Sequence, residues 1–336
     1  MAYRCSIYGL GIVANSTIPS VPSAKIANSD IRISFGALPH WIHEARMEIV
    51  YVADYADDCG HPVLRVFRAL DSSYYRFCYS DRTEFLIDHK GTKIWARWPD
   101  PLTIEDTTTY LLGPIMGFVL LLRGLVSLHA SAIAIGGNAI ALVGPAGAGK
   151  STAAAAFAER GYNILAEDVV TLDDRADHFL VRPAYPCIRL WPASVEALYG
   201  SPTHLPRLTP NWDKCYLDLA DRFQQQPLPL KAIYQLHPRS DDPRAPFVEP
   251  LDRAEGLMSL VANTYGAKMI DKRMRAREFE LLTRVLNNVP LRRITPHTDP
   301  SRISELCDRI LNDFESPQIH GALTGSDSRS SVKISG

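Results

Sequence analysis

The sequence predicts an α/β fold in which a β-rich N-terminal half precedes a mixed core of strands and helices. The first hundred residues contain short runs of β-branched and aromatic residues, separated by polar residues, glycine and proline. Short apolar runs then alternate with helical patterns, and the run at 139–143 leads through a glycine-rich turn into a helix. Pro-Asp-Pro at 99–101 breaks the pattern. We therefore predict a β-rich domain at 1–100 and a core domain at 101–315.

The predicted strands of the N-terminal half are short and follow one another closely. They cover residues 3–13, 30–35, 47–52, 63–67, 74–79, 84–88 and 93–98. The last two flank His89-Lys90-Gly91-Thr92, which is typical of a hairpin turn. Asp54, Asp57, Asp58 and His61 are interpreted as an acidic surface loop rather than a metal site. No catalytic group is evident here, so we expect this half to bind or assemble.

Composition and charge exclude several classes of protein. The 336 residues carry a formal net charge of -1, so no overall field attracts nucleic acid or an anionic membrane. The six cysteines lack C-x-x-C spacing, which argues against a zinc site and a disulfide scaffold. The N-terminus lacks the apolar run of a signal peptide, and the most apolar segment, 111–122, is too short to span a bilayer. We expect a soluble cytoplasmic protein that binds neither nucleic acid nor membrane.

The core domain begins with a helix pattern at 104–123, which Pro114 should kink or divide. Gly136-Gly137 then marks a tight hairpin turn between two strands. Further strands are predicted at 127–135, 138–143, 163–166, 169–172, 179–182 and 231–236, and further helices at 152–160, 192–198, 253–264, 271–289 and 301–314. Residues 201–212 are expected to form a loop, and 316–336 a disordered tail rich in serine, glycine and charge.

The glycine-rich turn carries the clearest chemical motif. Residues 144–151 read G-P-A-G-A-G-K-S and match the P-loop pattern G-x-x-x-x-G-K-[ST]. In such a loop, successive backbone N–H groups and a helix N-terminus surround phosphate oxygens, and glycine allows the close approach. Lys150 would reach the β- and γ-phosphates, and the Ser151 hydroxyl would bind Mg²⁺. The predicted nucleotide-binding residues are Gly144, Pro145, Ala146, Gly147, Ala148, Gly149, Lys150, Ser151 and Thr152. The motif therefore predicts a protein that binds a nucleoside triphosphate together with Mg²⁺.

Two adjacent carboxylates follow at the end of the next predicted strand. Glu167 and Asp168 lie sixteen and seventeen residues after Ser151. One of them could meet the Mg²⁺ beside Ser151, as a Walker-B aspartate does, and the other could take a proton from an attacking hydroxyl. We expect Ser151 and Asp168 at the metal, although the residues alone leave open which carboxylate is the base.

Other candidate catalytic residues lie outside these two motifs. His129 opens the strand that precedes the hairpin, where it could assist proton transfer. Arg189 lies in a strand-like stretch that could return toward the phosphates and stabilise the transferred group. Lys214 is a weaker candidate of the same kind. The predicted catalytic set is His129, Lys150, Glu167, Asp168 and Arg189.

These residues carry a resemblance to a known family. The run L-H-A-S-A-I-A-I-G-G-N-A-I-A-L-V-G-P-A-G-A-G-K-S-T, then E-R-G-Y-N-I-L-A-E-D-V-V and P-C-I-R-L-W-P-A-S-V-E-A-L-Y-G, resembles the kinase domain of the HPr kinase/phosphorylase family over residues 125–200. The resemblance implies a P-loop fold related to phosphoenolpyruvate carboxykinase and ATP-dependent phosphorylation of a serine. The family's carboxylate pair is usually two aspartates, whereas the first residue here is Glu167.

Among members of this family, the chain is similar in style to stand-alone kinases of lasso-peptide gene clusters. Those enzymes phosphorylate a serine at the C-terminus of a precursor peptide, and a β-rich N-terminal module would suit peptide binding by strand addition. The expected partner is therefore a peptide or small protein, and a homo-oligomer stays open. Alternatives are a kinase of a small hydroxy compound, an HPr kinase, and a non-catalytic ATP-binding regulatory module. The guanine-recognition motif N-K-x-D does not occur in the sequence, which argues against a GTPase switch.

Overall fold

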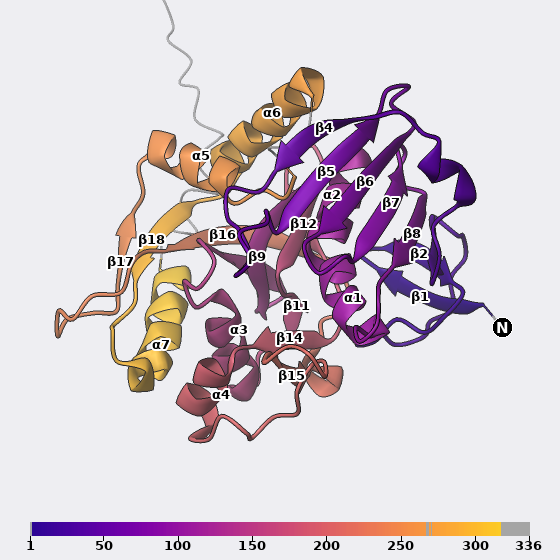
Figure 1. Ribbon diagram of the computed structural model, residues 1–336. Coiled ribbons are helices and arrows are strands. Elements are labelled where there is room, and N and C mark those ends of the chain that lie inside the picture. The colour runs from indigo at the N-terminus through magenta and orange to yellow at the C-terminus, as the bar shows by residue number, and fades with distance from the viewer. Residues whose placement is uncertain (1, 267–268, 270, 317–336) are drawn as a thin grey trace, which may run out of the picture.

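A computed structural model describes residues 2–266, 269 and 271–316. It contains two large β-sheets with helices between and around them, in agreement with the predicted α/β class (Figure 1). Only Ser316 of the predicted tail falls within the described residues, so the expectation for that segment lies outside them. None of the helices in the described part of the chain has the length and apolarity that crossing a bilayer requires.

The first sheet is built from the N-terminal half of the chain. Its strand order is β1-β2-β3-β8-β7-β6-β5-β4, and the pairs β2–β3 and β3–β8 are parallel. The strands are β1 (Tyr3–Ile7), β2 (Leu10–Ala14), β3 (Ile31–Phe35), β4 (Met47–Val52), β5 (Leu64–Ala69), β6 (Tyr74–Tyr79), β7 (Glu84–Asp88) and β8 (Lys93–Arg97). The strand expected at 3–13 is instead a hairpin, because Tyr8 and Gly9 turn the chain with φ of 56° and 72°.

The second sheet follows the order β10-β9-β12-β13-β16-β18-β17, with β11 paired to β9 and β10 also paired in parallel to β16. Its strands are β9 (Val126–Ile135), β10 (Asn138–Val143), β11 (Ile164–Ala166), β12 (Val169–Asp174), β13 (Phe179–Arg182), β16 (Leu228–Leu236), β17 (Phe247–Pro250) and β18 (Leu291–Thr295). β14 (Cys187–Leu190) and β15 (Cys215–Asp218) form a separate pair. The expected antiparallel hairpin β9–β10 is confirmed, with Gly136 and Gly137 both at positive φ.

The helices surround the second sheet and separate it from the first. They are α1 (Ile104–Tyr110), α2 (Met116–Leu122), α3 (Lys150–Glu159), α4 (Pro192–Tyr199), α5 (Arg253–Ala262), α6 (Lys272–Asn288) and α7 (Ile303–Phe314), with shorter turns η1 (His40–His43), η2 (Leu111–Ile115), η3 (Ala220–Arg222) and η4 (Pro300–Arg302). The predicted division at Pro114 is confirmed. Gly113 takes a non-helical conformation there, inside the π-helical turn η2 that separates α1 from α2.

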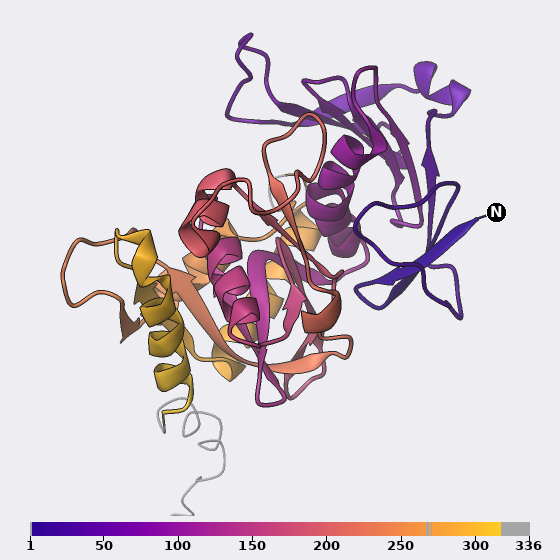
Figure 2. The ribbon, with the colours of Figure 1, turned by 90° about the horizontal axis from the view of Figure 1, so that it is seen from below.

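One continuous hydrophobic cluster joins the two sheets. α2 lies between them, and its Phe118 packs edge-on against Tyr75 and Phe77 of the first sheet. The same cluster includes Val126 and Val169 of the second sheet. Figure 2 shows the two sheets from below with the purple helices between them. The domain boundary near residue 100 thus separates the two sheets in sequence, but the buried core crosses it.

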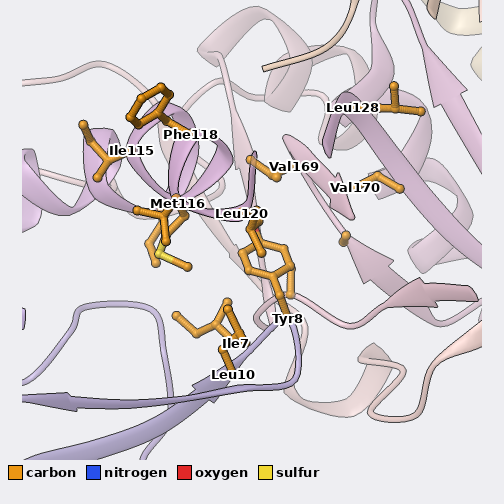
Figure 3. Packing of buried hydrophobic residues seen from close by; sticks show 14 of the residues in the cluster. Ile7, Tyr8, Leu10, Ile115, Met116, Phe118, Leu120, Leu128, Val169 and Val170 are labelled. Atoms are coloured by element: carbon orange, nitrogen blue, oxygen red, sulfur yellow. The ribbon is translucent and has the colours of Figure 1, made fainter. Parts of the chain in front are cut away.

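The β1–β2 turn reaches into this shared core. Tyr8 is fully buried, and Figure 3 shows it near Leu120 of α2 and Val169 of β12. The Tyr8 backbone N–H donates to the carbonyl of Pro183, and Arg182 Nη1 donates to the Tyr8 carbonyl. The N-terminal half therefore packs directly against the strands that carry the candidate site.

Candidate active site

The loop between β10 and α3 has the geometry of an anion cradle. Gly144 lies at a φ of 154°, and a Cβ there would stand 3.2 Å from the carbonyl oxygen of Leu236. Gly149 caps the N-terminus of α3 in the left-handed region, with a φ of 101°. Both positions therefore favour glycine. The loop ends on the free N–H groups of a ten-residue helix, where the helix dipole favours negative charge.

Lys150, the first residue of α3, directs its side chain back over the loop. Its Nζ donates to the carbonyl oxygens of Gly144 at 2.7 Å and Pro145 at 3.1 Å. Burial lowers the pKa of Lys150, although the two nearby carboxylates oppose that shift. The ammonium is thus held at the centre of the loop, where a bound polyphosphate would compete for its donors.

Glu167 and Asp168 lie at the corner between β11 and β12. The Ser151 hydroxyl donates to Glu167 Oε1 at 2.7 Å, so the loop and the carboxylate pair meet directly. Asp168 adopts a left-handed backbone conformation with a φ of 68°, so successive side chains at this corner point in different directions. The direct partner of Ser151 is therefore Glu167, whereas Ser151 and Asp168 were the two residues expected at the metal.

Arg189 on β14 donates hydrogen bonds to both carboxylates. Its Nη2 donates to Asp168 Oδ2 at 2.6 Å and its Nε to Glu167 Oε2 at 3.4 Å. Its Nη1 donates to the carbonyl of Thr109 at the end of α1. The Arg189 side chain is only 7% exposed. This geometry makes Arg189 a positioning residue for the two carboxylates, rather than a group free to reach a phosphate.

Asp168 has two further partners on its open side. The Tyr265 hydroxyl donates to Asp168 Oδ1 at 2.7 Å, and His129 Nε2 lies 3.4 Å from the same oxygen. The segment after α5 pairs with β9, because His129 N–H donates to Asn263 and Tyr265 N–H donates to Ser127. β9 thus brings His129 and Tyr265 to one carboxylate. Sequence reasoning missed Tyr265, which lies almost a hundred residues after Asp168 and carries no motif.

The pKa values of the two carboxylates shift in opposite directions. Burial raises the pKa of Glu167, and the adjacent Asp168 charge adds to that shift. Burial also acts to raise the pKa of Asp168, but Arg189 and His129 outweigh it and bring the pKa to about 2. Burial lowers the pKa of His129 below 6.5. At neutral pH, Asp168 is therefore ionised and the nearby imidazole is neutral.

The helical segment α1–η2–α2 packs against Asp168 and Tyr265 through two glycines. A Cβ on Gly113 would stand 2.7 Å from Asp168 Oδ2, and a Cβ on Gly117 would stand 2.6 Å from Tyr265 Cγ. Both glycines allow the helix backbone to pack directly on the carboxylate and on its hydroxyl partner. Their role could not be inferred from the sequence, because it depends on which segment faces the helix.

Two buried tyrosines extend the polar region behind the carboxylates. Tyr8 and Tyr185 are buried, and their hydroxyls have no hydrogen-bonding partner in the described chain. Burial raises the pKa of both phenols, and the charges of the carboxylate pair raise it further. Tyr8 belongs to the N-terminal half, where no residue was predicted to contribute to the site.

Lys214 approaches the site from the loop before β15. Its Nζ lies 5.0 Å from the ring centre of Trp191, which is 54% exposed, and its charge acts on both carboxylates.

Residues 201–212 contain no helix or strand, as expected. In the N-terminal half, Asp57 accepts from the backbone N–H groups of Cys59 and His61, which is a local turn rather than a metal site.

Comparisons with known proteins assign no family. No protein-family model and no curated protein matches the chain. Among solved structures, it is similar to the Hpr(Ser) kinase/phosphatase from Coxiella burnetii, with 15% sequence identity and a TM-score of 0.32. That match covers 58% of this chain and 93% of the other. A likeness at this level does not place the chain in that family, so the geometry of the site is the basis for its function.

Proposed function

We propose that this protein is an ATP- and Mg²⁺-dependent kinase that transfers the γ-phosphoryl group to a hydroxyl. The observation that carries the proposal is the 2.7 Å contact between Ser151 Oγ and Glu167 Oε1. It joins a phosphate-binding loop to a pair of carboxylates, which are the two parts that phosphoryl transfer from ATP requires. A module that only senses nucleotide has no need of the second carboxylate.

The residues beside the loop fit Mg²⁺. This ion prefers oxygen ligands and is usually held by one or two carboxylates, water and substrate phosphates. Ser151 and Glu167 provide such oxygens at the end of the loop. Among the described residues, no group of three or more His, Cys, Asp or Glu side chains could hold a metal by itself. A bound Mg²⁺ would neutralise charge on the phosphates.

Asp168, Lys150 and Arg189 have separate roles in the proposed transfer. The acceptor oxygen forms a bond to the γ-phosphorus as the bond from that phosphorus to the β–γ bridging oxygen breaks. We assign Asp168 as the base that takes the acceptor proton, because it is ionised and 21% exposed beside His129. Lys150 stabilises the charge that develops on the phosphates. Arg189 keeps the two carboxylates in place.

The acceptor is proposed to be a serine of a peptide or small protein. The resemblance of residues 125–200 to HPr kinases supports serine, and the similarity to lasso-cluster kinases supports the C-terminal serine of a precursor peptide. β4, an edge strand of the first sheet, carries the exposed apolar residues Ile49 and Val52, which suits strand addition by a peptide. The proposed reaction takes place in the cytoplasm, where ATP is available.

The test uses the full-length protein with γ-labelled ATP and Mg²⁺. The acceptors are a synthetic peptide that ends in serine, the same peptide ending in alanine, free serine and the protein HPr. We expect label on the serine peptide alone, and its loss in Lys150→Met, Asp168→Asn and Glu167→Gln. Lys231→Met on β16 is a control outside the site.

The outcomes separate the alternatives. Transfer to free serine would identify a small-molecule kinase, and transfer to HPr would identify an HPr kinase. ATP hydrolysis that depends on Lys150 but labels no acceptor would contradict the kinase proposal and favour a regulatory module. Wild-type transfer by Asp168→Asn would refute its assignment as the base.

A further inference from the structure

A cavity of about 190 Å³ lies beside the phosphate-binding loop, on the side away from the carboxylates. The end of the loop, α4, α7 and the segment before α7 enclose it. Its lining includes Gly149, Thr152, Ala193, Ser194, Ala197, Arg239 and His297. None of these residues belongs to the predicted catalytic set.

Ser151 and Thr152 both carry hydroxyls, and their side chains point in different directions. Ser151 Oγ contacts Glu167, on the side where the γ-phosphate is transferred. Thr152 Oγ1 instead donates to Ser194 Oγ on α4 at 2.8 Å, and both residues line the cavity. A triphosphate that runs along the loop with its γ end at Glu167 therefore has its other end at the mouth of this cavity.

The walls of the cavity suit a flat, largely apolar ring. Half of the residues that line the cavity are alanine, proline, isoleucine or leucine. Binding sites for small ligands typically combine such walls with a few directed polar groups. The small side chains of Ala193 and Ala197 leave the α4 wall open, so a ring can lie close to the helix.

Two polar side chains at the cavity complete a nucleoside site. His297 Nδ1 accepts from the Asp299 backbone N–H at 2.9 Å, so its Nε2 carries the proton and remains a donor. Arg239 Nη2 lies 3.5 Å from the point where a Cβ on Gly149 would stand. The Arg239 charge thus lies beside Gly149, where the loop borders the cavity, and it would face the first phosphate of a nucleotide whose base occupies that cavity.

We infer that this cavity holds the purine base and ribose of the nucleotide, with Arg239 beside the α-phosphate and His297 donating to the nucleoside. The inference rests on the proposed function, because it requires a triphosphate on the loop. It predicts that binding of ATP exceeds that of inorganic tripolyphosphate, which can occupy the loop but not the cavity.

The test compares two probes by titration calorimetry in the presence of Mg²⁺: ATP and inorganic tripolyphosphate. Ala197→Leu fills the cavity from α4, and leucine keeps the helix propensity high. We expect at least about tenfold weaker ATP binding, since a single methylene in such a pocket changes affinity by about ten- to two-hundredfold. Tripolyphosphate affinity should stay within twofold, which also shows that the loop is folded. Glu196→Leu, an exposed neighbour on α4, is the matched control.

A second variant tests the opposite wall. His297→Ala should weaken ATP binding selectively, and His297→Gln, which keeps an N–H donor, should restore part of the affinity. Unchanged ATP binding in both Ala197→Leu and His297→Ala would overturn the inference. Equal affinity of the wild type for ATP and tripolyphosphate would also overturn it while leaving the loop assignment intact. Failure of the wild type to bind either probe would instead refute the proposed function itself.

Discussion

Replacing Arg189 by methionine should destabilise the protein in a way that depends on pH. Arg189 donates to Glu167, Asp168 and the carbonyl of Thr109, and it is 7% exposed. Methionine removes the cation but leaves two carboxylates in a buried corner. Breaking a buried ion pair from one side costs about 3–5 kcal/mol. In a chain of this size, that loss lowers the Tm by about 5–10 °C.

The sign of the pH dependence follows from the carboxylates. In the wild type, Asp168 has a pKa of about 2, below its unfolded value of 3.8, so its stabilisation is present above 3.8 and is lost as the pH falls toward 2. Without Arg189, burial and mutual repulsion should raise the folded pKa of both carboxylates above their unfolded values. Between the unfolded and the folded pKa values of these carboxylates, the folded variant then binds more protons than the unfolded chain. Its stability therefore falls as the pH rises through that range.

The assay is thermal unfolding of the wild type, Arg189→Met and Arg189→Lys at pH 5 and pH 8. We expect the deficit of Arg189→Met to be largest at pH 8 and to shrink at pH 5. Lysine should recover only part of it, because an ammonium lacks the planar fork that joins both carboxylates. Arg292→Met, which breaks the partly buried pair with Asp313, is a control that should lose stability without losing Mg·ATP affinity. A deficit of Arg189→Met below about 1 kcal/mol, or one equal at both pH values, would refute this reasoning.

Three further variants probe the surroundings of the carboxylates. Tyr8→Phe should leave the Tm unchanged or slightly higher, because the hydroxyl it removes is buried without a partner among the described residues; a loss above about 2 kcal/mol would reveal a bond to that hydroxyl. Gly113→Ala should cost about 1–3 kcal/mol and reduce phosphoryl transfer, because its Cβ would meet Asp168 Oδ2. Gly256→Ala is a control, because its Cβ would meet Leu291, and it should reduce stability without reducing phosphoryl transfer. Equal activity in the Gly113 and Gly256 variants would count against the contact between Gly113 and Asp168. His129→Gln should flatten the rise of wild-type stability with pH just below 6.5, since the depressed pKa of His129 makes the folded state bind fewer protons there; an unchanged pH profile of the Tm would exclude that contribution.

The sequence by itself determined the local elements that carry the loop. The continuous apolar run at 139–143 predicted β10, the glycines predicted the turn, and alanine-rich 153–156 favoured a helix, so the segment 139–160 could be placed without tertiary information. The position of Glu167-Asp168 after the next strand was also local. These features depend on hydrogen bonds and backbone preferences within a few residues, which a sequence pattern records directly.

Strands whose stability comes from distant partners were less visible. β15, β17 and β18 were not predicted, and each has only four or five residues. β18 lies between β16 and β17, so its backbone is satisfied by segments far away in sequence. The single strand expected at 3–13 was wrong for the opposite reason, since a two-residue turn at Tyr8 interrupts an otherwise continuous β pattern.

Only the tertiary structure decided which side chains meet at the carboxylates. Arg189 was a candidate for the phosphate, yet its position on β14 buries it behind Glu167 and Asp168. Tyr265 reaches Asp168 because the segment after α5 pairs with β9. Such contacts join segments up to about a hundred residues apart, and a single sequence contains no signal for them, because burial and charge pairing arise only once the sheets and helices have packed.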